Sequence, residues 1–364
     1  MSNTFGKLYR LTTFGESHGP AMGGIIDGCP AGIFINQEEI AQQLARRRPG
    51  QSHLTTSRNE DDKVVILSGI YNGFTTGTPL GFIIENKAQI SSDYDELANI
   101  FRPGHADYTY HTKYRGFNDP RGGGRASARE TVCRVFGGAI ATQILRHIVP
   151  SVSITAYTKS VGTMSIPTPS AIPTIQQIDA NAVRCPDGDV AIKMEEIITA
   201  ARNDGDTVGG VVECIVHGCP PGLGEPVFNK LSAGLASAMM SINGAKGFEL
   251  GMGFEGSQSR GSEVVDNWIP DNSDTRGIST QHNYSGGIQG GISNGEDIIF
   301  RVAFKPVATL MRDIATVDHQ GNAITLHAKG RHDPCIVPRA VPVVEAMAAM
   351  TILDFVLLER AGRL

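Results

Sequence analysis

A short part of the chain, residues 114–134, combines two residue types that suit the binding of an anion. It contains five arginines, two acids and no lysine. Three consecutive glycines, Gly122–Gly124, lie at its centre, where a backbone without side chains exposes its N–H groups. A guanidinium group matches phosphate and carboxylate oxygens with paired hydrogen bonds. We therefore predict an anion site here, supplied by Arg115, Arg121, Arg125, Arg129 and Arg134.

A helix is expected directly after these glycines. Ser127 and Glu130 have the spacing of a capping box. Helix N-termini favour anions, whereas arginines in a first turn oppose the helix dipole unless an anion arrives from elsewhere. The alternative is a solvated loop whose arginines pair with nearby carboxylates, although two acids cannot pair five arginines. The expected apolar face of the helix consists of Val132, Phe136, Ile140 and Ile144.

Two histidines in glycine-containing turns are candidates for proton transfer, because imidazole titrates near neutral pH. His18 follows Glu16 and Ser17 in a turn flanked by glycines. His105 lies in a Pro-Gly turn shortly before the arginine-rich segment, without a second ligand at a metal-binding spacing. A structural role for each histidine remains the alternative.

Two further basic segments extend the candidate anion site. The helix expected after Asn36 ends in Arg46–Arg48, where basic residues either complement the helix dipole or add a second anion contact. Near the C-terminus, Arg331–Asp333 combine a cation, an imidazole and a carboxylate in one turn. Alternatively, Asp333 only begins a turn, because Pro334 follows it.

The composition is that of a globular protein rather than of a nucleic-acid-binding or membrane protein. The 364 residues carry a net charge of −5, with a pI near 6.1, whereas nucleic-acid binders usually contain a basic domain. The most apolar segment, residues 341–358, is short for a membrane span and contains Glu345 and Asp354, so a buried helix is expected. The N-terminus has no secretory pattern, and the six scattered cysteines include no C-x-x-C pair. These features predict a cytoplasmic protein without a bound metal.

One glycine motif suggests a cofactor site that its surroundings exclude. Residues 251–256 spell G-x-G-x-x-G, the fingerprint of a dinucleotide site. That fingerprint opens an apolar helix, but Ser-Gln-Ser-Arg-Gly-Ser follows it here. The chain also lacks a P-loop motif. We therefore expect neither a Rossmann domain nor a P-loop nucleotide site.

Two distant segments are similar to each other. Residues 23–32 and 209–222 share a double glycine, an aliphatic pair, an acid and a final Gly-Cys-Pro-x-Gly. Each leads into an expected helix, near 36–48 and 229–241. A strand–helix unit used twice predicts one large pseudo-symmetric domain over residues 1–364 rather than two domains joined by a linker.

Six motifs occur in order along essentially the whole chain. They are G-E-S-H-G-P at 15–20, R-P-G-H-A-D-Y at 102–108, R-G-G-G-R-A-S-A-R-E-T at 121–131, S-I-N-G-A-K-G at 241–247, G-G-I-S-N-G at 290–295 and G-R-H-D-P-C at 330–335. No single motif would suffice, but the ordered set resembles the chorismate synthase family.

The resemblance implies an activity, a fold and an assembly. The implied activity is the 1,4-elimination of phosphate from 5-enolpyruvylshikimate 3-phosphate to give chorismate, with reduced FMN as cofactor, in the shikimate pathway of aromatic amino-acid biosynthesis. The implied fold is α+β, a β-α-β sandwich of antiparallel sheets with helices between them. The implied assembly is a homotetramer with no nucleic-acid or membrane partner.

The same resemblance implies roles for individual residues. His18 would protonate the departing phosphate, and His105 would stabilise the reduced flavin. Asp333, together with Ser17, would relay a proton from flavin N5. The substrate bears a phosphate and two carboxylates, about four negative charges near neutral pH. Its implied contacts are Arg46, Arg47, Arg48, Arg129 and Arg331.

Cofactor contacts follow from the resemblance as well. Arg47 and His53 match positions credited with NADPH contact, so NADPH is a candidate reductant. Ala126, Gly244 and His53 depart from the serine, alanine and arginine common there in the family. The implied FMN contacts are Arg125, Ala126, Ser127, Asn243, Gly244, Gly290, Lys305, Pro306, Val307, Ala308, Thr309 and Arg331.

The residues alone leave two other classes open. A phosphotransferase or phosphatase would use the same anion site but needs a divalent metal, and the sequence shows no carboxylate cluster of suitable spacing. An RNA-binding module would rest on the arginine-rich segment, but its arginines alternate with glycine rather than with aromatic residues.

Overall fold

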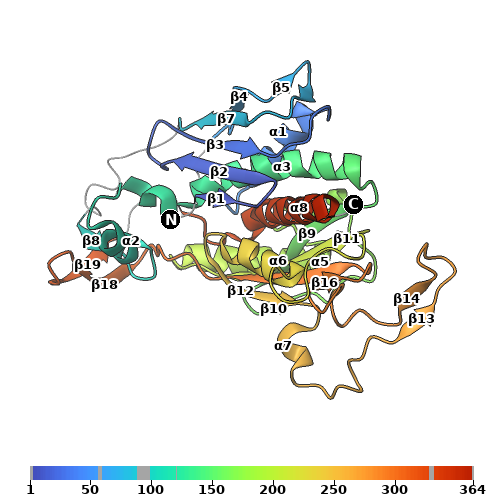
Figure 1. Ribbon diagram of the computed structural model, residues 1–364. Coiled ribbons are helices and arrows are strands. Elements are labelled where there is room, and N and C mark those ends of the chain that lie inside the picture. The colour runs from blue at the N-terminus through green and yellow to red at the C-terminus, as the bar shows by residue number, and fades with distance from the viewer. Residues whose placement is uncertain (1–2, 56–59, 88–98, 120, 328–331, 363–364) are drawn as a thin grey trace.

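The computed structural model describes residues 3–55, 60–87, 99–119, 121–327 and 332–362. Within them, the chain forms two five-stranded antiparallel sheets with long helices between them (Figure 1). This mixture of helices and antiparallel sheets confirms the α+β class predicted from the sequence.

The first sheet comes from the N-terminal part of the chain. Its inner face is apolar because apolar side chains alternate along its strands, as with the buried Leu80, Phe82 and Ile84 of one strand. The strand order is β1-β2-β3-β7-β4. The strands are β1 (Thr4–Phe5), β2 (Arg10–Gly15), β3 (Ala21–Asp27), β7 (Leu80–Glu85) and β4 (Val64–Ile66).

The second sheet comes from the C-terminal part and is built in the same way. Ile298, Phe300, Val302 and Phe304 are buried on one face of a central strand, and the residues between them are half-buried. The strand order is β10-β9-β11-β17-β12. The strands are β10 (Met164–Ser165), β9 (Ser153–Val161), β11 (Gly210–His217), β17 (Ile298–Phe304) and β12 (Ala245–Leu250).

Helices fill the space between the sheets. Helix α3 (Thr131–Ile148) packs on β2 and β3, α8 (Val337–Gly362) packs on β9 and β11, and α3 and α8 pack on each other. Helix α1 (Gln37–Arg47) contacts both α3 and α8, and α6 (Leu231–Met240) lies against α8 and β12. Figure 1 shows α3 and α8 side by side between the two sheets.

Helix α8 is the buried helix expected near the C-terminus. By length and composition it would be able to cross a membrane, but 83% of its apolar window is buried inside the protein. Its two acids have partners: Glu345 pairs with Arg46, and Asp354 accepts hydrogen bonds of 2.7–2.9 Å from the backbone N–H groups of residues 7–9. The expectation of a core helix is confirmed.

The two halves of the chain repeat one order of elements. In the first half, β3 leads into α1, and β4 then pairs with β7 ahead of α3. In the second half, β11 leads into α6, and β12 pairs with β17 ahead of α8. The similar segments 23–32 and 209–222 thus fall on β3 and β11, which hold the same place in their sheets.

Smaller elements surround this sandwich. A three-stranded sheet, β19-β18-β8, and helix α2 lie together at one end of the molecule (Figure 1). The β13–β14 hairpin extends away from the body at the other end. The bounds are β8 (Ile100–Phe101), α2 (Asp107–Tyr114), β18 (Asp313–Asp318), β19 (Ala323–His327), β5 (Ile70–Tyr71), β6 (Phe74–Thr75), α4 (Ile175–Ile178), α5 (Gly188–Asn203), α7 (Gly253–Gly256), β13 (Trp268–Pro270), β14 (Ile278–Thr280), β15 (Ile288–Gln289) and β16 (Ile292–Ser293).

The start of α3 differs from the capping-box prediction. Ser127 does cap a turn, accepting a 3.3 Å bond from the Arg129 N–H, but that turn is a 3₁₀ turn and α3 begins at Thr131. The Glu130 side chain makes bonds elsewhere, since it accepts from Thr13 and pairs with Arg134. A capping box requires that glutamate to reach back to the cap backbone, so the motif is incomplete here.

Candidate active site

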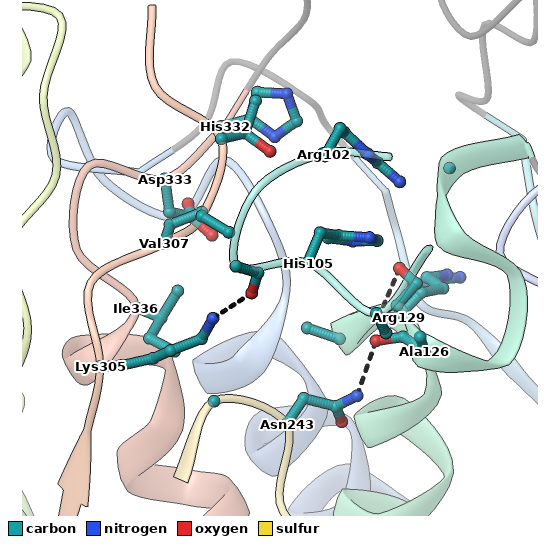
Figure 2. Close-up of a pocket in the computed structure, with 18 of the residues that line it drawn as sticks. Arg102, His105, Ala126, Arg129, Asn243, Lys305, Val307, His332, Asp333 and Ile336 are labelled. Atoms are coloured by element: carbon teal, nitrogen blue, oxygen red, sulfur yellow. Dashed lines mark hydrogen bonds between the residues drawn. The ribbon is translucent and has the colours of Figure 1, made fainter. Parts of the chain in front are cut away.

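A cavity of about 590 Å³ opens where the small sheet meets the sandwich (Figure 2). This volume lies within the range of about 300–1,000 Å³ that is usual for ligand sites. Both halves of the chain contribute to its wall. The lining residues are His18, Arg47, Pro49, Arg102, Gly104, His105, Ala106, Thr109, Tyr110, Gly122, Ala126, Ser127, Ala128, Arg129, Asn243, Gly244, Ala245, Lys246, Lys305, Pro306, Val307, Ala308, Thr309, His332, Asp333, Ile336 and Arg339.

His18 sits on the wall in a turn that Ser17 and a glycine fix. The histidine is 4% exposed, and its Nδ1 lies 3.2 Å from the Ser17 hydroxyl oxygen. Gly122 adopts φ +62°, and a Cβ there would lie 2.1 Å from the His18 ring. Only glycine allows this approach in this backbone conformation. The glycine therefore fixes how closely the loop packs on the imidazole.

The next two glycines have similar neighbours. A Cβ on Gly123 would lie 3.1 Å from His105 Cε1, and one on Gly124 would lie 2.7 Å from a Glu16 carboxylate oxygen. Both have positive φ angles. Burial, reinforced by the charge of Asp119, raises the pKa of Glu16, although nearby arginines oppose the shift. The three-glycine run thus packs between the two histidines and this carboxyl group.

His105 is held by Asp107, at the start of α2. Its Nδ1 lies 2.5 Å from the carboxylate, which also accepts two 2.7 Å bonds from the Arg102 guanidinium. Burial alone would raise the pKa of Asp107, but the bonds from Arg102 and His105 hold it well below its usual range. Figure 2 shows Arg102 and His105 on the same side of the cavity. The carboxylate fixes both side chains relative to each other.

Two buried arginines from different elements share one carboxylate. Asp62 pairs with Arg47, from the end of α1, and with Arg129, from the turn before α3. Burial lowers the pKa of Arg47 to about 10, and Arg339 and Arg129 act in the same direction against Asp62. Burial would raise the pKa of Asp62, but the two arginines together lower it. Arg339 joins this group, donating to the Arg47 carbonyl at 3.1 Å and pairing with Asp333.

The opposite wall comes from the second half of the chain. Asn243 donates a 2.8 Å bond to the Ala126 carbonyl, which fixes the two halves against each other. Its Oδ1 is buried without a hydrogen-bond partner in the part of the chain that the structure describes. Lys305 donates to the Gly104 carbonyl, and burial together with the charge of Lys246 lowers its pKa. This wall therefore presents an unused acceptor and two ammonium groups.

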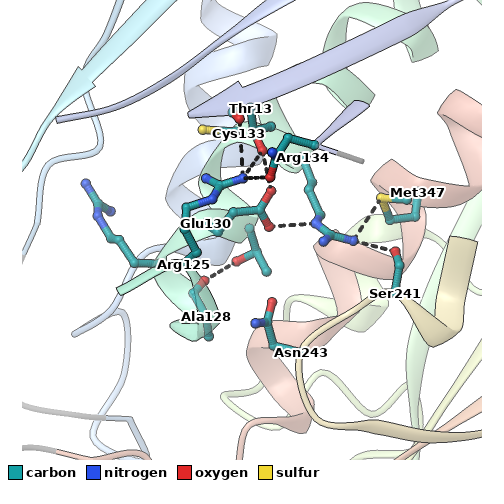
Figure 3. A network of polar contacts seen from close by, with 12 residues as sticks. Thr13, Arg125, Ala128, Glu130, Cys133, Arg134, Ser241, Asn243 and Met347 are labelled. Carbon is teal, nitrogen blue, oxygen red and sulfur yellow. Dashed lines mark hydrogen bonds and ion pairs between the residues drawn. The ribbon is translucent and has the colours of Figure 1, made fainter. Parts of the chain in front are cut away.

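Behind the three-glycine run, Gly122–Gly124, a chain of polar contacts joins the first sheet to α6 (Figure 3). Arg125 donates to the Thr13 hydroxyl at 2.8 Å, and Thr13 donates to Glu130 at 3.0 Å. Glu130 pairs with Arg134 at 2.7 Å, and Arg134 donates to Ser241 at 2.6 Å. These contacts make Arg125 and Arg134 supports of the wall, and neither lines the cavity.

The arginine-rich segment therefore contributes fewer anion contacts than predicted. Of its five arginines, Arg129 lines the cavity. Arg121 pairs with Asp119 at 2.8 Å on the surface, and Arg115 is the exposed C-cap of α2. The prediction counted only acids within the segment, whereas carbonyls, hydroxyls and the distant Asp62 also satisfy these side chains.

Most of the residues predicted from the family resemblance do come together. The cavity is lined by His18, His105, Asp333, Arg47, Ala126, Ser127, Arg129, Asn243, Gly244, Lys305, Pro306, Val307, Ala308 and Thr309.

Other predicted residues lie elsewhere. Ser17 is buried behind His18. Arg46 bonds Asp179 at 2.8 Å and pairs with Glu345, which places its charge in the core. The His53 side chain is 68% exposed, 3.5 Å from Glu195. Arg331 lies outside the described residues. In all, six predicted residues with described positions lie away from the lining: Ser17, Arg46, Arg48, His53, Arg125 and Gly290.

Four basic or acidic residues of the site were not predicted. Arg102 and Lys246 lie inside motifs 102–108 and 241–247, so those motifs carried a signal for them. His332, the imidazole of the predicted turn 331–333, does line the cavity. Asp62 and Arg339 lie in no motif, and the sequence carries no pattern that would have placed them here.

Comparisons with known proteins agree with one another. A family model described as chorismate synthase matches residues 9–357. A relative from Azobacteroides pseudotrichonymphae, named chorismate synthase, is 60% identical over 355 residues, covering 98% of this chain and 99% of its own. A relative of the same name from Phocaeicola vulgatus is 54% identical over 364 residues, covering 100% of both. A solved structure, "Crystal Structure of Chorismate Synthase", superimposes with a TM-score of 0.74 at 30% identity, covering 98% of this chain and 94% of that one.

Proposed function

The chain belongs to the chorismate synthase family, and on that premise we propose that its cavity is where the substrate meets reduced FMN. The activity is the 1,4-elimination of phosphate from 5-enolpyruvylshikimate 3-phosphate to give chorismate. The enzyme is thus a carbon–oxygen lyase of the shikimate pathway. One observation carries the assignment of the cavity: among its described lining residues, Asp333 is the single acid, facing four arginines and two lysines.

These cations match the charge of the substrate. A phosphate and two carboxylates amount to about four negative charges near neutral pH. Arg47, Arg129 and Arg339 form one group on the wall, and guanidinium groups bind such oxyanions bidentately. We assign the substrate to this group. Arg46, which is engaged with Asp179 and Glu345, plays no part in the assignment.

We assign protonation of the departing phosphate to His18. A phosphate leaves more readily when a positioned acid protonates it, and histidine is suited to this near neutral pH. The Ser17 hydroxyl contacts Nδ1 of this ring, so Nε2 is the atom that would deliver the proton. Ser17 thereby orients the ring as well as contributing to the proposed proton relay with Asp333.

The residues of the opposite wall fit FMN. The buried acceptor Asn243 Oδ1 suits an N–H of a flavin ring, and Lys246 and Lys305 suit a phosphate group. When bound, reduced FMN supplies the electrons that the elimination uses transiently, with no net redox change. The residues proposed to hold it are Ala126, Ser127, Asn243, Gly244, Lys305, Pro306, Val307, Ala308 and Thr309, while Arg125 supports the loop, and Gly290 and Arg331 remain predicted contacts.

His105 would act beside that cofactor. The Asp107 carboxylate, 2.5 Å from Nδ1, holds the imidazole ring in one orientation. A ring N–H group held at this place would stabilise the anionic form of a reduced flavin by a hydrogen bond. His105 thus has a different task from His18, although both line one cavity.

At larger scale, we propose one domain, a pseudo-symmetric β-α-β sandwich over residues 1–364, because both halves repeat the same order of elements. We further propose a cytoplasmic homotetramer without nucleic-acid or membrane partners. The projecting hairpin supports assembly, since a two-stranded ribbon is marginally stable alone, and its Trp268 and Ile269 are 47% and 40% exposed. Light scattering of the purified protein should give four times the chain mass.

The test is an anaerobic assay of the purified protein with 5-enolpyruvylshikimate 3-phosphate. Chorismate and phosphate should appear in equal amounts when reduced FMN is supplied. Turnover by flavin-free protein would sink the proposal. His18→Ala should lower kcat by about 10²–10⁴-fold while FMN binding, followed by the flavin difference spectrum, stays at the wild-type level.

A further inference from the structure

We propose that Asp62 is a positioning residue, whose carboxylate holds Arg47 and Arg129 at the spacing that binds one oxyanion of the substrate. The inference rests on the proposed function and deepens it. Asp62 does not line the cavity, but both of its partners do. It would therefore act through them rather than by touching the substrate.

The geometry of the pair is specific. Asp62 Oδ2 accepts from the Arg47 NH2 group, and Oδ1 accepts from the Arg129 NH1 group. One oxygen serves each arginine, so the planar carboxylate sets the distance and the tilt between the two guanidinium groups. The side chain of Asp62 is 0% exposed, that of Arg47 is 1% and that of Arg129 is 3%. The Asp62 carboxylate therefore has no surface open to bulk water.

The charges of Asp62, Arg47 and Arg129 do not balance without a ligand. Within the described part of the chain, one carboxylate faces two guanidinium groups, which leaves one buried positive charge uncompensated. The neighbouring Arg339 brings its own acid, Asp333, and adds no net charge. Buried charges are costly unless they are paired. An oxyanion in the cavity supplies the missing negative charge.

An unused donor points to the same conclusion. Arg47 Nε is buried and has no hydrogen-bond partner among the residues that the structure describes. A guanidinium carries five N–H donors in a fixed plane, and buried donors are rarely left unpaired. Arg47 lines the cavity, so a phosphate or carboxylate oxygen bound there can supply the acceptor.

A second contact ties this pair to the proposed acid. Arg129 Nε donates to Asn86 Oδ1 at 2.9 Å. The Asn86 amide then donates to the carbonyls of Glu16 and Gly19 at 3.1 and 2.9 Å. These two residues flank Ser17 and His18. The same network therefore fixes the arginines and the turn that carries the histidine.

The backbone at Asp62 provides a clean substitution. Its φ is +50°, a left-handed conformation that few residues other than glycine adopt, with Asp and Asn among those that tolerate it best. Asp62→Asn therefore keeps the shape and the backbone conformation. It removes the charge and one of the two acceptor oxygens, so one arginine is released.

The experiment measures substrate affinity by calorimetry in the presence of oxidised FMN, which does not support turnover. A positioning role predicts that Asp62→Asn weakens the binding of 5-enolpyruvylshikimate 3-phosphate by about tenfold to a hundredfold, as expected for a displaced binding group. A role in charge balance alone predicts tighter binding, because the site becomes more positive. A role in stability alone predicts unchanged affinity. Either of these last two results would overturn the inference.

A second ligand shows whether the arginine pair binds the phosphate or a carboxylate of the substrate. Chorismate keeps both carboxylates but lacks the phosphate. If the Asp62→Asn variant loses affinity for the substrate and not for chorismate, the arginine pair binds the phosphate. If both affinities fall, the pair binds a carboxylate. If neither falls, the inference fails.

The matched control is Asp354→Asn. Asp354 is also a buried carboxylate, 6% exposed, but its bonds go to the backbone of residues 7–9. This variant should lose stability and keep wild-type affinity. If Asp62→Asn does not fold, Asp62→Glu preserves the charge and displaces it by one methylene, and wild-type affinity in that variant would contradict a positioning role.

The proposed function and the role of Asp62 can fail separately. If the wild-type protein does not form chorismate with reduced FMN, the proposed function is wrong. If the wild-type protein does form chorismate and Asp62→Asn binds the substrate as well as wild type does, only the role of Asp62 is wrong.

Discussion

At the scale of single residues, three consecutive glycines determine how closely the loop that contains them packs on the two histidines of the cavity. Gly122 packs on His18, Gly123 packs on His105, and all three glycines of the run have positive φ angles. Most residues avoid this conformation because their Cβ would collide with the backbone. The run is therefore a spacer with a defined shape, in addition to a source of backbone N–H groups.

Substitution of Gly122 should impair catalysis beyond its effect on stability. In Gly122→Ala, a Cβ would lie 2.1 Å from the His18 ring and displace it. We expect kcat to fall by about a hundredfold. The matched control is Gly277→Ala, since Gly277 has φ +74° and a Cβ there would meet no atom of the described residues within 4 Å. Both variants should lose about 1–2 kcal/mol from the left-handed backbone, and equal kcat values would contradict the spacer role.

Asp107 should make stability depend on pH in the acid range. Its pKa is lowered in the folded protein by Arg102 and His105 against the effect of burial. The stabilisation is therefore complete above the unfolded value of about 3.9 and is lost as the pH falls further, when the folded carboxylate takes up its proton. Urea denaturation should show a stability gap between wild type and Asp107→Asn that is constant near pH 7 and narrows below about pH 4. A gap that persists unchanged at pH 3 would contradict this.

The sequence predicts the site residues that lie in marked local patterns. His18 and His105 stand in glycine-containing turns, Asn243 lies in one of the six motifs, and Lys305–Thr309 are implied by the family resemblance. Asp62 and Arg339 have no such pattern. Their roles depend on the folded chain bringing residue 62 beside 47 and 129, and residue 339 beside 47. Contacts between residues so far apart in the sequence are set by the packing of the folded chain, and a short stretch of sequence gives no information about them.

At the scale of elements, α3 and α8 pack closely on each other. A Cβ on Gly138 of α3 would lie 2.3 Å from both Cα and Cβ of Ala346 in α8. The two helices therefore approach backbone to backbone, as small residues permit. The first sheet rests on α3 and the second on α8, so this contact sets the thickness of the whole sandwich.

Two helix glycines should respond to alanine with opposite signs. Gly138→Ala overpacks the α3–α8 contact and should destabilise the protein by about 1–3 kcal/mol or more. Gly188 begins α5, and no described residue lies within 4 Å of a Cβ placed there. Gly188→Ala should therefore stabilise by up to about 1 kcal/mol through helix propensity. Urea denaturation of both variants checks this. If Gly188→Ala also destabilised the protein, the predicted gain from helix propensity would be wrong.

Elements were easier to predict than their ends. Asn36 caps α1 as expected, accepting from the N–H groups of Glu38 and Glu39, because that contact is local in the sequence. Ser127 and Glu130 have equally good spacing, yet Glu130 bonds Thr13 and Arg134. Thr13 lies on β2, far away in the chain. A tertiary partner thus overrides a local motif and moves the start of α3.

At the scale of the whole molecule, the cavity requires both halves of the chain. His18, Arg47, His105 and Arg129 come from the first half, and the residues at 243–246, 305–309 and 332–339 come from the second. The repeat of strand and helix predicts that the halves are alike. The repeat does not predict that the two halves contribute different side chains to the cavity. That difference depends on the loops between the repeated elements, which are not alike in the two halves.

The chain should need an external source of reduced flavin. Of the two residues matched to NADPH contact, Arg47 belongs to the group assigned to the substrate, and His53 is exposed outside the cavity lining. NADPH with FMN under anaerobic conditions should therefore give no chorismate, whereas photoreduced FMN should support turnover in the same assay. Formation of chorismate with NADPH, FMN and no added reductase would show that the chain reduces its own flavin.

The place of α8 has a consequence for biosynthesis. This helix lies between the two sheets, yet it is made of residues 337–362 and leaves the ribosome after all the strands of both sheets. Until then, β9 and β11 of the second sheet lack the helix that packs on them, and the amides of residues 7–9 lack the carboxylate of Asp354. Nascent chains with uncovered apolar surface are prone to aggregate. Both sheets must therefore wait for a helix that is synthesised after them before the core between them is complete.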